Sequence, residues 1–278
     1  AWRTAWVDSA KSRWGDNILG IYYYDEPGGM WIDTYSNVTR RLASNATYST
    51  IAQMAINDIQ TDGGVIQLKN NSIPMFVSDY ALFWFDYLAG YDTVFVEMGW
   101  NHSLVQDIAL IRGAANIQGK DWGAIVVWKY DREPYIDSGE AIYDQMVTAY
   151  KAGAKYITIF NYPQMPDNSY GVMQEEHFEA LERFWNDAVS GKIGHNSIIA
   201  ETVLVLPKDY GWGMRHPDDR IWGFWGPDEK SPVIWEQKNR LLGKYGYTLD
   251  IIYDDLRFPV RDKYKQVYFW NSTEPFDG

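Results

Sequence analysis

The chain has 278 residues, of which 46% are apolar, so it can bury a substantial core in one large domain or one domain and a half. Its formal net charge is -12 and it has no block rich in Lys or Arg, which argues against nucleic acid or an anionic membrane as a partner. The absence of cysteine excludes disulfides, thiolate metal sites and a cysteine nucleophile. No stretch approaches the ~20 apolar residues that cross a bilayer, so we predict no membrane span in this chain.

The first predicted elements are a helix over residues 1–14, with an apolar residue at every fourth position, and a buried strand over residues 18–24. This strand of apolar and aromatic β-formers runs directly into Asp25 and Glu26. Alternation along the strand places Glu26 on the same face as Tyr24 and turns Asp25 to the other face. Acids at the carboxyl ends of parallel strands are candidate catalytic residues. The alternative is that Asp25-Glu26-Pro27 forms only a solvent-exposed turn.

A Pro-Gly-Gly sequence follows and predicts an irregular polar segment over residues 27–46. Beyond this segment, predicted strands and helices alternate up to residue 189. We interpret Asp79 as the N-cap of a helix and Gly90 as the stop of that helix. The strands are short and nearly all apolar, which favours parallel strands covered on both faces. The predicted strands are 73–77, 93–97, 124–128 and 156–160, and the predicted helices are 49–60, 80–88, 103–117, 139–152 and 174–189.

A shift to Gly, Asn and Ser at residues 191–197 predicts a domain boundary. Beyond it, a smaller α/β unit is predicted, with a loop rich in Trp and Gly after its first strand. This loop is either a lid that brings Trp212 to the ligand or a well-packed irregular loop. The predicted strands of this unit are 202–206, 249–253 and 266–270, its helix is 232–245, and the loop covers residues 210–226.

Polar and aromatic residues collect after the predicted strands of the first unit, where a parallel α/β fold places its site. Glu97 ends one strand and is the candidate partner of Glu26. The other candidate substrate-binding residues are Tyr24, Trp100, Asn101, Trp128, Lys129, Tyr130, Asn161, Tyr162 and Trp212. No phosphate loop, dinucleotide motif or histidine pair with metal-ligand spacing is present, so we predict no cofactor and no metal.

Two features of the composition favour a carbohydrate partner and an extracellular or cell-surface location. Aromatic residues make up 17% of the chain, and such rings stack on sugars or build interfaces, although an aromatic-rich core and surface also explains most of them. Five Asn-X-Ser/Thr patterns are glycosylation acceptors. They begin at Asn37, Asn45, Asn70, Asn101 and Asn271.

The strand that ends in Asp25-Glu26-Pro27 resembles the Asn-Glu-Pro strand end of clan A glycoside hydrolases, where that Glu closes the fourth strand of a (β/α)8 barrel and acts as general acid/base. The resemblance implies that the five predicted strands are the fourth to eighth of a TIM-type barrel, with residues 1–195 as its C-terminal part. It further implies that residues 196–278 begin a Rossmann-like or amidotransferase-like domain, and that the chain is a piece of a longer protein.

One departure from this family concerns the second carboxylate. Clan A enzymes resemble one another in a nucleophilic Glu at the end of the seventh strand, whereas this chain has Trp128-Lys129-Tyr130 there. Glu97, at the end of the sixth strand in the same alignment, is the better-placed acid. Because retaining hydrolases separate their carboxyls by about 5–5.5 Å and inverting ones by about 6.5–9.5 Å, the distance between Glu26 and Glu97 decides the mechanism.

The first hypothesis is therefore an extracellular glycoside hydrolase in which Glu26 protonates the glycosidic oxygen, Glu97 acts as nucleophile or base, and Asp25 orients them. Burial among aromatic residues is expected to hold Glu26 protonated near neutral pH, while Glu97 remains ionised. The alternative is a non-catalytic cell-surface or assembly glycoprotein that kept a hydrolase-like fold. Its partners are further segments of the same protein or a surface assembly.

Overall fold

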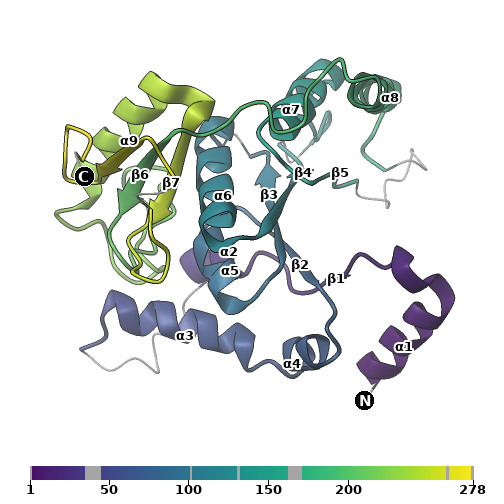
Figure 1. The fold of residues 1–278 in the computed structure, drawn as a ribbon, viewed down its shortest axis with the longest axis horizontal. Coiled ribbons are helices and arrows are strands. Elements are labelled where there is room, and N and C mark those ends of the chain that lie inside the picture. The colour runs from purple at the N-terminus through teal and green to yellow at the C-terminus, as the bar shows by residue number, and fades with distance from the viewer. Residues whose placement is uncertain are drawn as a thin grey trace.

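The computed structural model describes residues 2–34, 45–100, 102–129, 132–161, 171–260 and 263–276. Two parallel β-sheets lie side by side, with helices between them and around them (Figure 1). The larger sheet has five strands in the order β1-β2-β3-β4-β5, and every neighbouring pair is parallel. Its strands are β1 (Ile21–Tyr22), β2 (Met75–Asp79), β3 (Thr93–Met98), β4 (Asp121–Val126) and β5 (Tyr156–Ile159).

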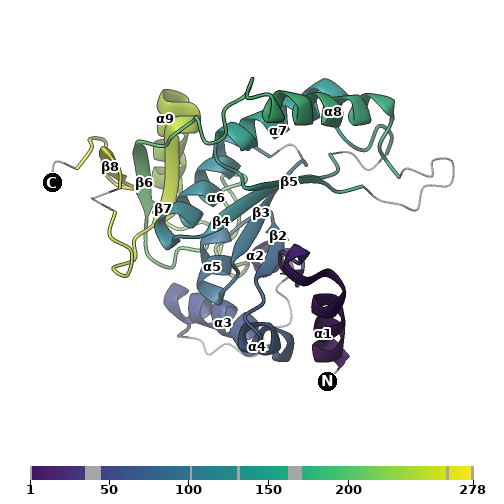
Figure 2. The ribbon, with the colours of Figure 1, turned by 45° about the vertical axis from the view of Figure 1, so that its right-hand side comes forward.

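The larger sheet curls into half of a barrel (Figure 2). The prediction of an α/β fold with parallel strands is confirmed. The described strands do not close into an eight-stranded barrel, so this finer part of the predicted fold class is not shown. The helices associated with this sheet are α1 (Trp2–Trp14), α2 (Pro27–Asp33), α3 (Tyr48–Gln60), α4 (Gly63–Asn70), α5 (Phe83–Ala89), α6 (Leu104–Gln118), α7 (Gly139–Lys151) and α8 (Glu175–Val189), and a short 3-10 turn, η1 (Gly15–Asn17), follows α1.

Helix α2 lies in the segment that the sequence predicted to be irregular, so that prediction is wrong. Pro27 occupies the first turn, where its missing N–H leaves no bond unmade. The Asp79 carboxylate accepts hydrogen bonds from the backbone N–H groups of Gly28 at 2.5 Å and Gly29 at 2.9 Å. A Cβ at Gly28 would clash with the carbonyl oxygen of Ala81, which explains the glycine. Long-range contacts with β2 therefore start a helix that local propensity does not predict.

The smaller sheet has three parallel strands in the order β7-β6-β8. These three strands and helix α9 agree with the predicted elements to within one or two residues. They are β6 (Thr202–Leu206), β7 (Leu249–Tyr253), β8 (Gln266–Phe269) and α9 (Ser231–Tyr245), and a 3-10 turn, η3 (Gly246–Thr248), leads into β7.

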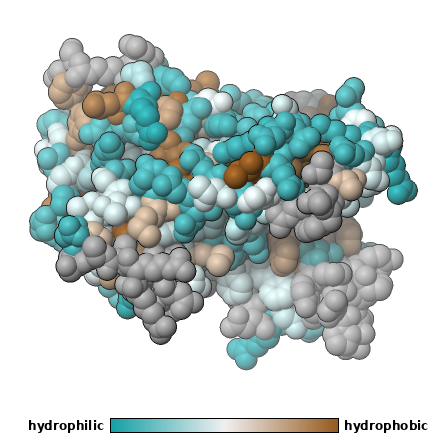
Figure 3. Space-filling model, turned by 90° about the horizontal axis from the view of Figure 1, so that it is seen from below, coloured by the Kyte–Doolittle hydropathy of each residue, from teal (hydrophilic) through white to brown (hydrophobic). Residues whose placement is uncertain are grey.

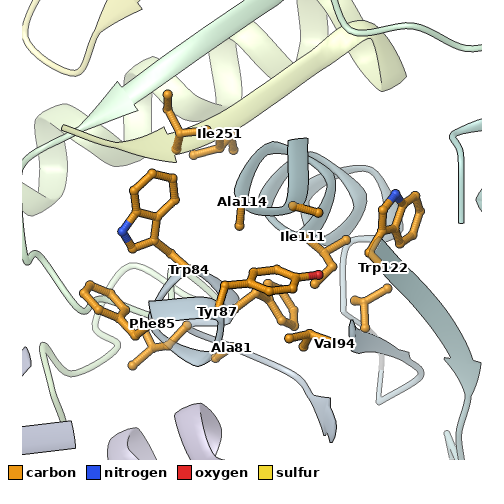
Figure 4. Packing of buried hydrophobic residues seen from close by; sticks show 14 of the residues in the cluster. Ala81, Trp84, Phe85, Tyr87, Val94, Ile111, Ala114, Trp122 and Ile251 are labelled. Atoms are coloured by element: carbon orange, nitrogen blue, oxygen red, sulfur yellow. The ribbon is translucent and has the colours of Figure 1, made fainter. Parts of the chain in front are cut away.

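One hydrophobic cluster extends through both sheets. In Figure 4, aromatic side chains of α5, among them Trp84 and Tyr87, lie between residues of the larger sheet, helix α6 and Ile251 of β7. Helix α6 approaches β7 so closely that a Cβ at Gly113 would lie 2.7 Å from the carbonyl oxygen of Ile251. The elements on the two sides of the predicted boundary at residues 191–197 therefore share a core.

Hydrophilic residues cover much of the face seen in Figure 3, and the hydrophobic residues on it form scattered patches. Helix α1 lies apart from the sheets (Figure 1), and the side chains of Trp6 and Trp14 are about half exposed. The predicted apolar stripe of this helix is therefore only partly buried, through Val7 and Ala10. None of the helices in the described ranges is long and apolar enough to cross a membrane.

Candidate functional site

The carboxyl ends of β1, β2 and β3 meet at one edge of the larger sheet and bring Glu26 and Glu97 into contact. Glu97 lies within β3 and is only 5% exposed, whereas Glu26 follows β1 and is half-buried. A hydrogen bond between the two carboxyl groups lowers the pKa of Glu26 and raises that of Glu97. Such a bond forms only when one of the two groups is protonated, because a carboxylate cannot donate.

Ser78, at the end of β2, connects this pair to Asp25. Its hydroxyl donates to Oε1 of Glu97 at 2.7 Å and lies 2.7 Å from the hydroxyl of Tyr22. The Tyr22 hydroxyl in turn donates to Oδ1 of Asp25 at 2.6 Å. Asp25 therefore belongs to the same hydrogen-bonded network as Glu97, and the expectation that it turns to the other face is wrong.

The backbone explains why strand alternation fails here. Tyr24 and Glu26 have φ angles of 69° and 48°, in the left-handed region that residues with a Cβ rarely adopt. These two residues bend the chain at the end of β1, so Asp25 and Glu26 no longer alternate as in a strand. Trp100, just beyond β3, has a φ of 49° and adds a third strained position at this edge. Such strain clusters at functional sites because it holds side chains in defined positions.

Burial and, to a smaller extent, the charges of Glu26 and Asp79 together raise the pKa of Glu97 to about 8, although the hydrogen bond from Ser78 acts in the opposite direction. The pKa of Glu26 is also raised by burial, but the hydrogen bond from Glu97 acts in the opposite direction. Burial therefore raises the pKa of both acids, as expected for Glu26. The expectation that Glu97 keeps an ordinary pKa and remains ionised is wrong, because Glu97 lies inside the sheet.

Asp79, at the end of β2, and Asp86, in α5, form a second pair of acids. Asp79 and Asp86 are 0% and 1% exposed, and burial raises the pKa of Asp79 to about 7. The pKa of Asp86 is raised well above its usual range by burial and by the charge and hydrogen bond of Asp79. The prediction that Asp79 is the N-cap of the following helix is wrong, because α5 has Leu82 at that position and the Asp79 carboxylate binds the first turn of α2 instead. Sequence reasoning also missed Ser78 and Asp86. The signal for Ser78 and Asp79 was the polar Ser-Asp pair that ends an otherwise apolar strand.

The remaining predicted binding residues differ in their positions. Tyr24 and Trp100 are 47% and 44% exposed at the edge that carries the carboxyl pair. The ring of Trp128 is half-buried and lies 5.8 Å from that of Tyr135, while Lys129 pairs with Asp137 at 2.9 Å. Asn101, Tyr130 and Tyr162 lie outside the described residues, as does the glycosylation pattern at Asn37.

Two predicted binding residues have evident structural roles instead. The Asn161 side chain accepts hydrogen bonds from the backbone N–H groups of Val172 and Met173, and it fixes that turn. Trp212 is 1% exposed and its indole N–H donates to the carbonyl oxygen of Asp219 at 2.9 Å. Trp212 is therefore a core residue, which is the second of the two interpretations of its loop.

The loop over residues 210–226 nevertheless contacts helix α2 through a different residue, Arg215. Arg215 donates two hydrogen bonds to the carboxylate of Asp33 in α2, at 2.7 and 2.8 Å, and also binds Asp219. The hydroxyl of Tyr80, which follows β2, donates to the same Asp33 carboxylate at 2.6 Å. This network ties the loop to the C-terminal end of α2, the helix that begins directly after Glu26.

The raised pKa values predict a pH dependence of stability. An unfolded chain loses the Glu97 proton near its ordinary pKa of 4.5, whereas the folded chain keeps it to about pH 8. This contribution to stability is therefore fully present below the unfolded pKa and is lost as the pH rises toward 8. Relative to Glu97→Gln, the wild type should lose up to about 1.4 kcal/mol of unfolding free energy per pH unit in this window. Urea unfolding of both proteins at about pH 5 and pH 8 measures it, and a pH-independent difference would contradict it.

Within the described ranges, no group of three or more His, Asp or Glu side chains is arranged to hold a metal ion. A comparison with protein-family models finds none that matches the chain, and a comparison with curated proteins finds no matching relative. The assignment to clan A glycoside hydrolases is therefore wrong: it rested on three residues, and the sheet is an open half-barrel. The chain is an α/β protein with two parallel sheets. Since such a fold hosts many functions, the best indication of function is the pair Glu26 and Glu97 at the edge of the larger sheet.

Proposed function

We propose that this protein hydrolyses O-glycosidic bonds in oligo- or polysaccharides with Glu97 as the proton donor and Glu26 as the second carboxylate. The observation that carries this proposal is the contact of two carboxyl groups in different environments at the edge of the sheet, Glu97 buried and Glu26 at the rim. Glycoside hydrolysis requires one carboxylic acid and one carboxylate, and two acids in different environments supply them at one pH.

The chemistry follows from the difference between the two groups. With a pKa of about 8, Glu97 keeps its proton at neutral pH and can transfer it to the glycosidic oxygen as that bond breaks. The Glu26 carboxylate then stabilises the positive charge that develops on the sugar, either by bonding to it or by activating water. Asp25, Tyr22 and Ser78 hold the pair through the hydrogen bonds described above. A glycosidic oxygen or a water that enters between the carboxyls replaces their mutual hydrogen bond.

Exposed aromatic rings beside the acids support a carbohydrate ligand. Tyr22, Tyr24 and Trp100 are between 44% and 51% exposed, although each carries a large apolar surface. Rings of this kind stack on the apolar faces of sugars. The strongly negative net charge of -12 favours a neutral ligand over an anionic one.

We also propose that the protein is exported, as an extracellular or cell-surface protein. The acceptor residues Asn45, Asn70 and Asn271 are all exposed. Native material is therefore expected to carry glycan on at least one acceptor Asn. Intact-mass analysis before and after enzymatic deglycosylation tests this, and a mass equal to that of the bare polypeptide would contradict it.

A second candidate function is non-catalytic glycan binding by a surface glycoprotein. The observation that favours it is the direct hydrogen bond between Glu26 and Glu97, which places the carboxyls closer than the about 5 Å of retaining enzymes. In this case the acids bind sugar hydroxyls instead of transferring a proton.

The two candidates are separated by incubating the purified chain with neutral oligosaccharides and measuring both binding and new reducing ends. Hydrolysis predicts new reducing ends that depend on Glu97. Binding without any new reducing ends, between about pH 4 and pH 8, supports the non-catalytic alternative and overturns the hydrolase proposal.

A further inference from the structure

Asp79 lies at the carboxyl end of β2 and its side chain is fully buried. Its neighbour Ser78 faces Glu97, so alternation along the strand turns Asp79 to the opposite face of the sheet. There its carboxylate accepts hydrogen bonds from the backbone N–H groups of Gly28 and Gly29 in the first turn of α2, at 2.5 and 2.9 Å. Asp79 therefore approaches the carboxyl pair from behind, through the helix that begins directly after Glu26.

The same carboxylate also fixes the chain that follows β2. It accepts hydrogen bonds from the backbone N–H groups of Tyr80 at 2.7 Å and Ala81 at 3.1 Å. A buried carboxylate that binds backbone N–H groups of two separate segments holds both of them in one arrangement. Asp79 thereby joins the segment after β1 to the segment after β2, which are the two segments that lie next to the acids.

The backbone of Glu26 is held on both sides by the end of β2. Its N–H donates to the carbonyl oxygen of Ser78 at 3.0 Å, and the two N–H groups bound by Asp79 come two and three residues after it. Glu26 occupies the N-cap position of α2, but its own side chain caps no N–H group of this helix. A left-handed residue such as Glu26 persists only where its surroundings over-determine it, and the bonds of Ser78 and Asp79 supply that constraint.

Asp79 is the acid in its surroundings that ionises near neutral pH. Burial raises its pKa to about 7, although the backbone N–H groups act in the opposite direction. Burial, with the charge and hydrogen bond of Asp79, keeps Asp86 of α5 protonated by raising its pKa well above the usual range. The charge of Asp79 also acts on Tyr80 and Tyr91, whose pKa values burial raises so far that both hydroxyls stay neutral.

The charge of Asp79 reaches the carboxyl pair as well. Burial and the charges of Glu26 and Asp79 raise the pKa of Glu97. Since a neighbouring negative charge disfavours ionisation of an acid, removing the charge of Asp79 lowers the pKa of Glu97. The titration of Glu97 therefore reports on Asp79 without any turnover.

We propose that Asp79 is a positioning residue of the carboxyl pair, which holds Glu26 against Glu97 through the first turn of α2. This inference rests on the paired acids of the proposed function and adds the buried residue that sets their geometry. Asp79 itself lies on the far face of the sheet, so it acts on the substrate only through Glu26 and Glu97.

The test compares the wild type with Asp79→Asn. Asparagine keeps the shape of the side chain, but its amide nitrogen cannot accept a hydrogen bond from a backbone N–H, and it carries no charge. Asp228→Asn is the matched control, because the Asp228 carboxylate accepts hydrogen bonds from the backbone N–H groups of Lys230 and Ser231 at the start of α9, beside the smaller sheet. The Glu97 carboxyl is titrated by ¹³C NMR and initial rates are measured, at a temperature at which urea unfolding shows each protein to be folded.

We expect Asp79→Asn to lower the pKa of Glu97 and to reduce kcat at least about tenfold with little change in KM, because a misplacement of about 1 Å can cost about a hundredfold. Asp228→Asn should change neither quantity, even if it unfolds in less urea. An unchanged Glu97 pKa in Asp79→Asn, or equal changes in both variants, overturns the positioning role. If Asp79→Asn lowers the Glu97 pKa while the wild type cleaves nothing, the positioning role stands and the hydrolase proposal fails.

A measurement on the wild type covers the case in which Asp79→Asn does not fold. The amide proton resonances of Gly28 and Gly29 are followed by NMR as the pH is raised. Because both amides donate to Asp79, we expect them to shift together with an apparent pKa near 7, and the Glu97 carboxyl resonance to respond in the same range. Amide resonances that do not move between about pH 6 and pH 8 overturn the proposal.

Discussion

Glu97→Gln is expected to slow the cleavage of unactivated oligosaccharides at least about a hundredfold. Glutamine keeps the shape of the side chain and still accepts the hydrogen bond that Ser78 donates to Oε1 of Glu97. It has no acidic proton to transfer to the glycosidic oxygen. Initial rates of reducing-end formation at fixed pH measure the effect. Aryl glycosides with good leaving groups should be less affected, because their bond breaks with little protonation.

Glu26→Gln removes the carboxylate of the pair, and its effect should not depend on the leaving group of the substrate. The developing positive charge needs the carboxylate whatever the leaving group, so both substrate types should slow by a similar factor. Glu140→Gln is the control, because Glu140 lies in α7 with its side chain 66% exposed, and it should leave the rate unchanged. If Glu26→Gln and Glu97→Gln both retain the wild-type rate, the pair is not catalytic and the non-catalytic glycoprotein is favoured.

The largest expected effect on stability comes from Arg112→Met. The Arg112 side chain is 2% exposed, and its Nε donates to Oδ1 of Asp250 at 2.7 Å, which joins α6 to β7. Its guanidinium also donates to the carbonyl oxygens of Tyr247 and Leu249. Removing it leaves the fully buried Asp250 carboxylate without its cation, which should cost about 3–5 kcal/mol of unfolding free energy.

Urea unfolding of the wild type, Arg112→Met and Lys265→Met measures the loss of unfolding free energy, and Lys265→Met is the control. The Lys265–Glu201 ion pair is exposed, with side chains 73% and 54% accessible, so its loss should change the unfolding free energy by less than about 1 kcal/mol. If Arg112→Met is as stable as the control variant, the buried ion pair does not stabilise the contact between the two sheets.

The parallel strands of this fold could be predicted because their signal is local. The short apolar runs of β3 and β6, each followed by a helix, needed no knowledge of distant residues. Helix α2 could not be predicted, since the Pro-Gly-Gly that begins it has poor helix propensity and is held by the carboxylate of Asp79, 50 residues later in the chain. The difference is that tertiary hydrogen bonds override local preference at this point.

The candidate site also has features that the sequence predicts and features that depend on the folded structure. The acids Glu26 and Glu97 were recognisable because each follows a run of strand-forming residues. Which of the two holds the proton was not predictable, because it depends on how deeply each carboxyl is buried in the folded sheet. The position of Asp25 also required the structure, since the left-handed backbone of Tyr24 and Glu26 breaks the alternation that the sequence implied.

The proton shared by Glu26 and Glu97 is tested most directly by an NMR titration of the protein labelled with ¹³C at the glutamate side-chain carboxyls. The Glu97 resonance is assigned by its loss in Glu97→Gln. We expect it to remain protonated at neutral pH and to titrate near pH 8, and we expect Glu26→Gln to lower that pKa by removing the neighbouring charge. If the Glu97 carboxyl instead titrates near its ordinary pKa of 4.5, the two acids share no proton and the proposed chemistry is contradicted.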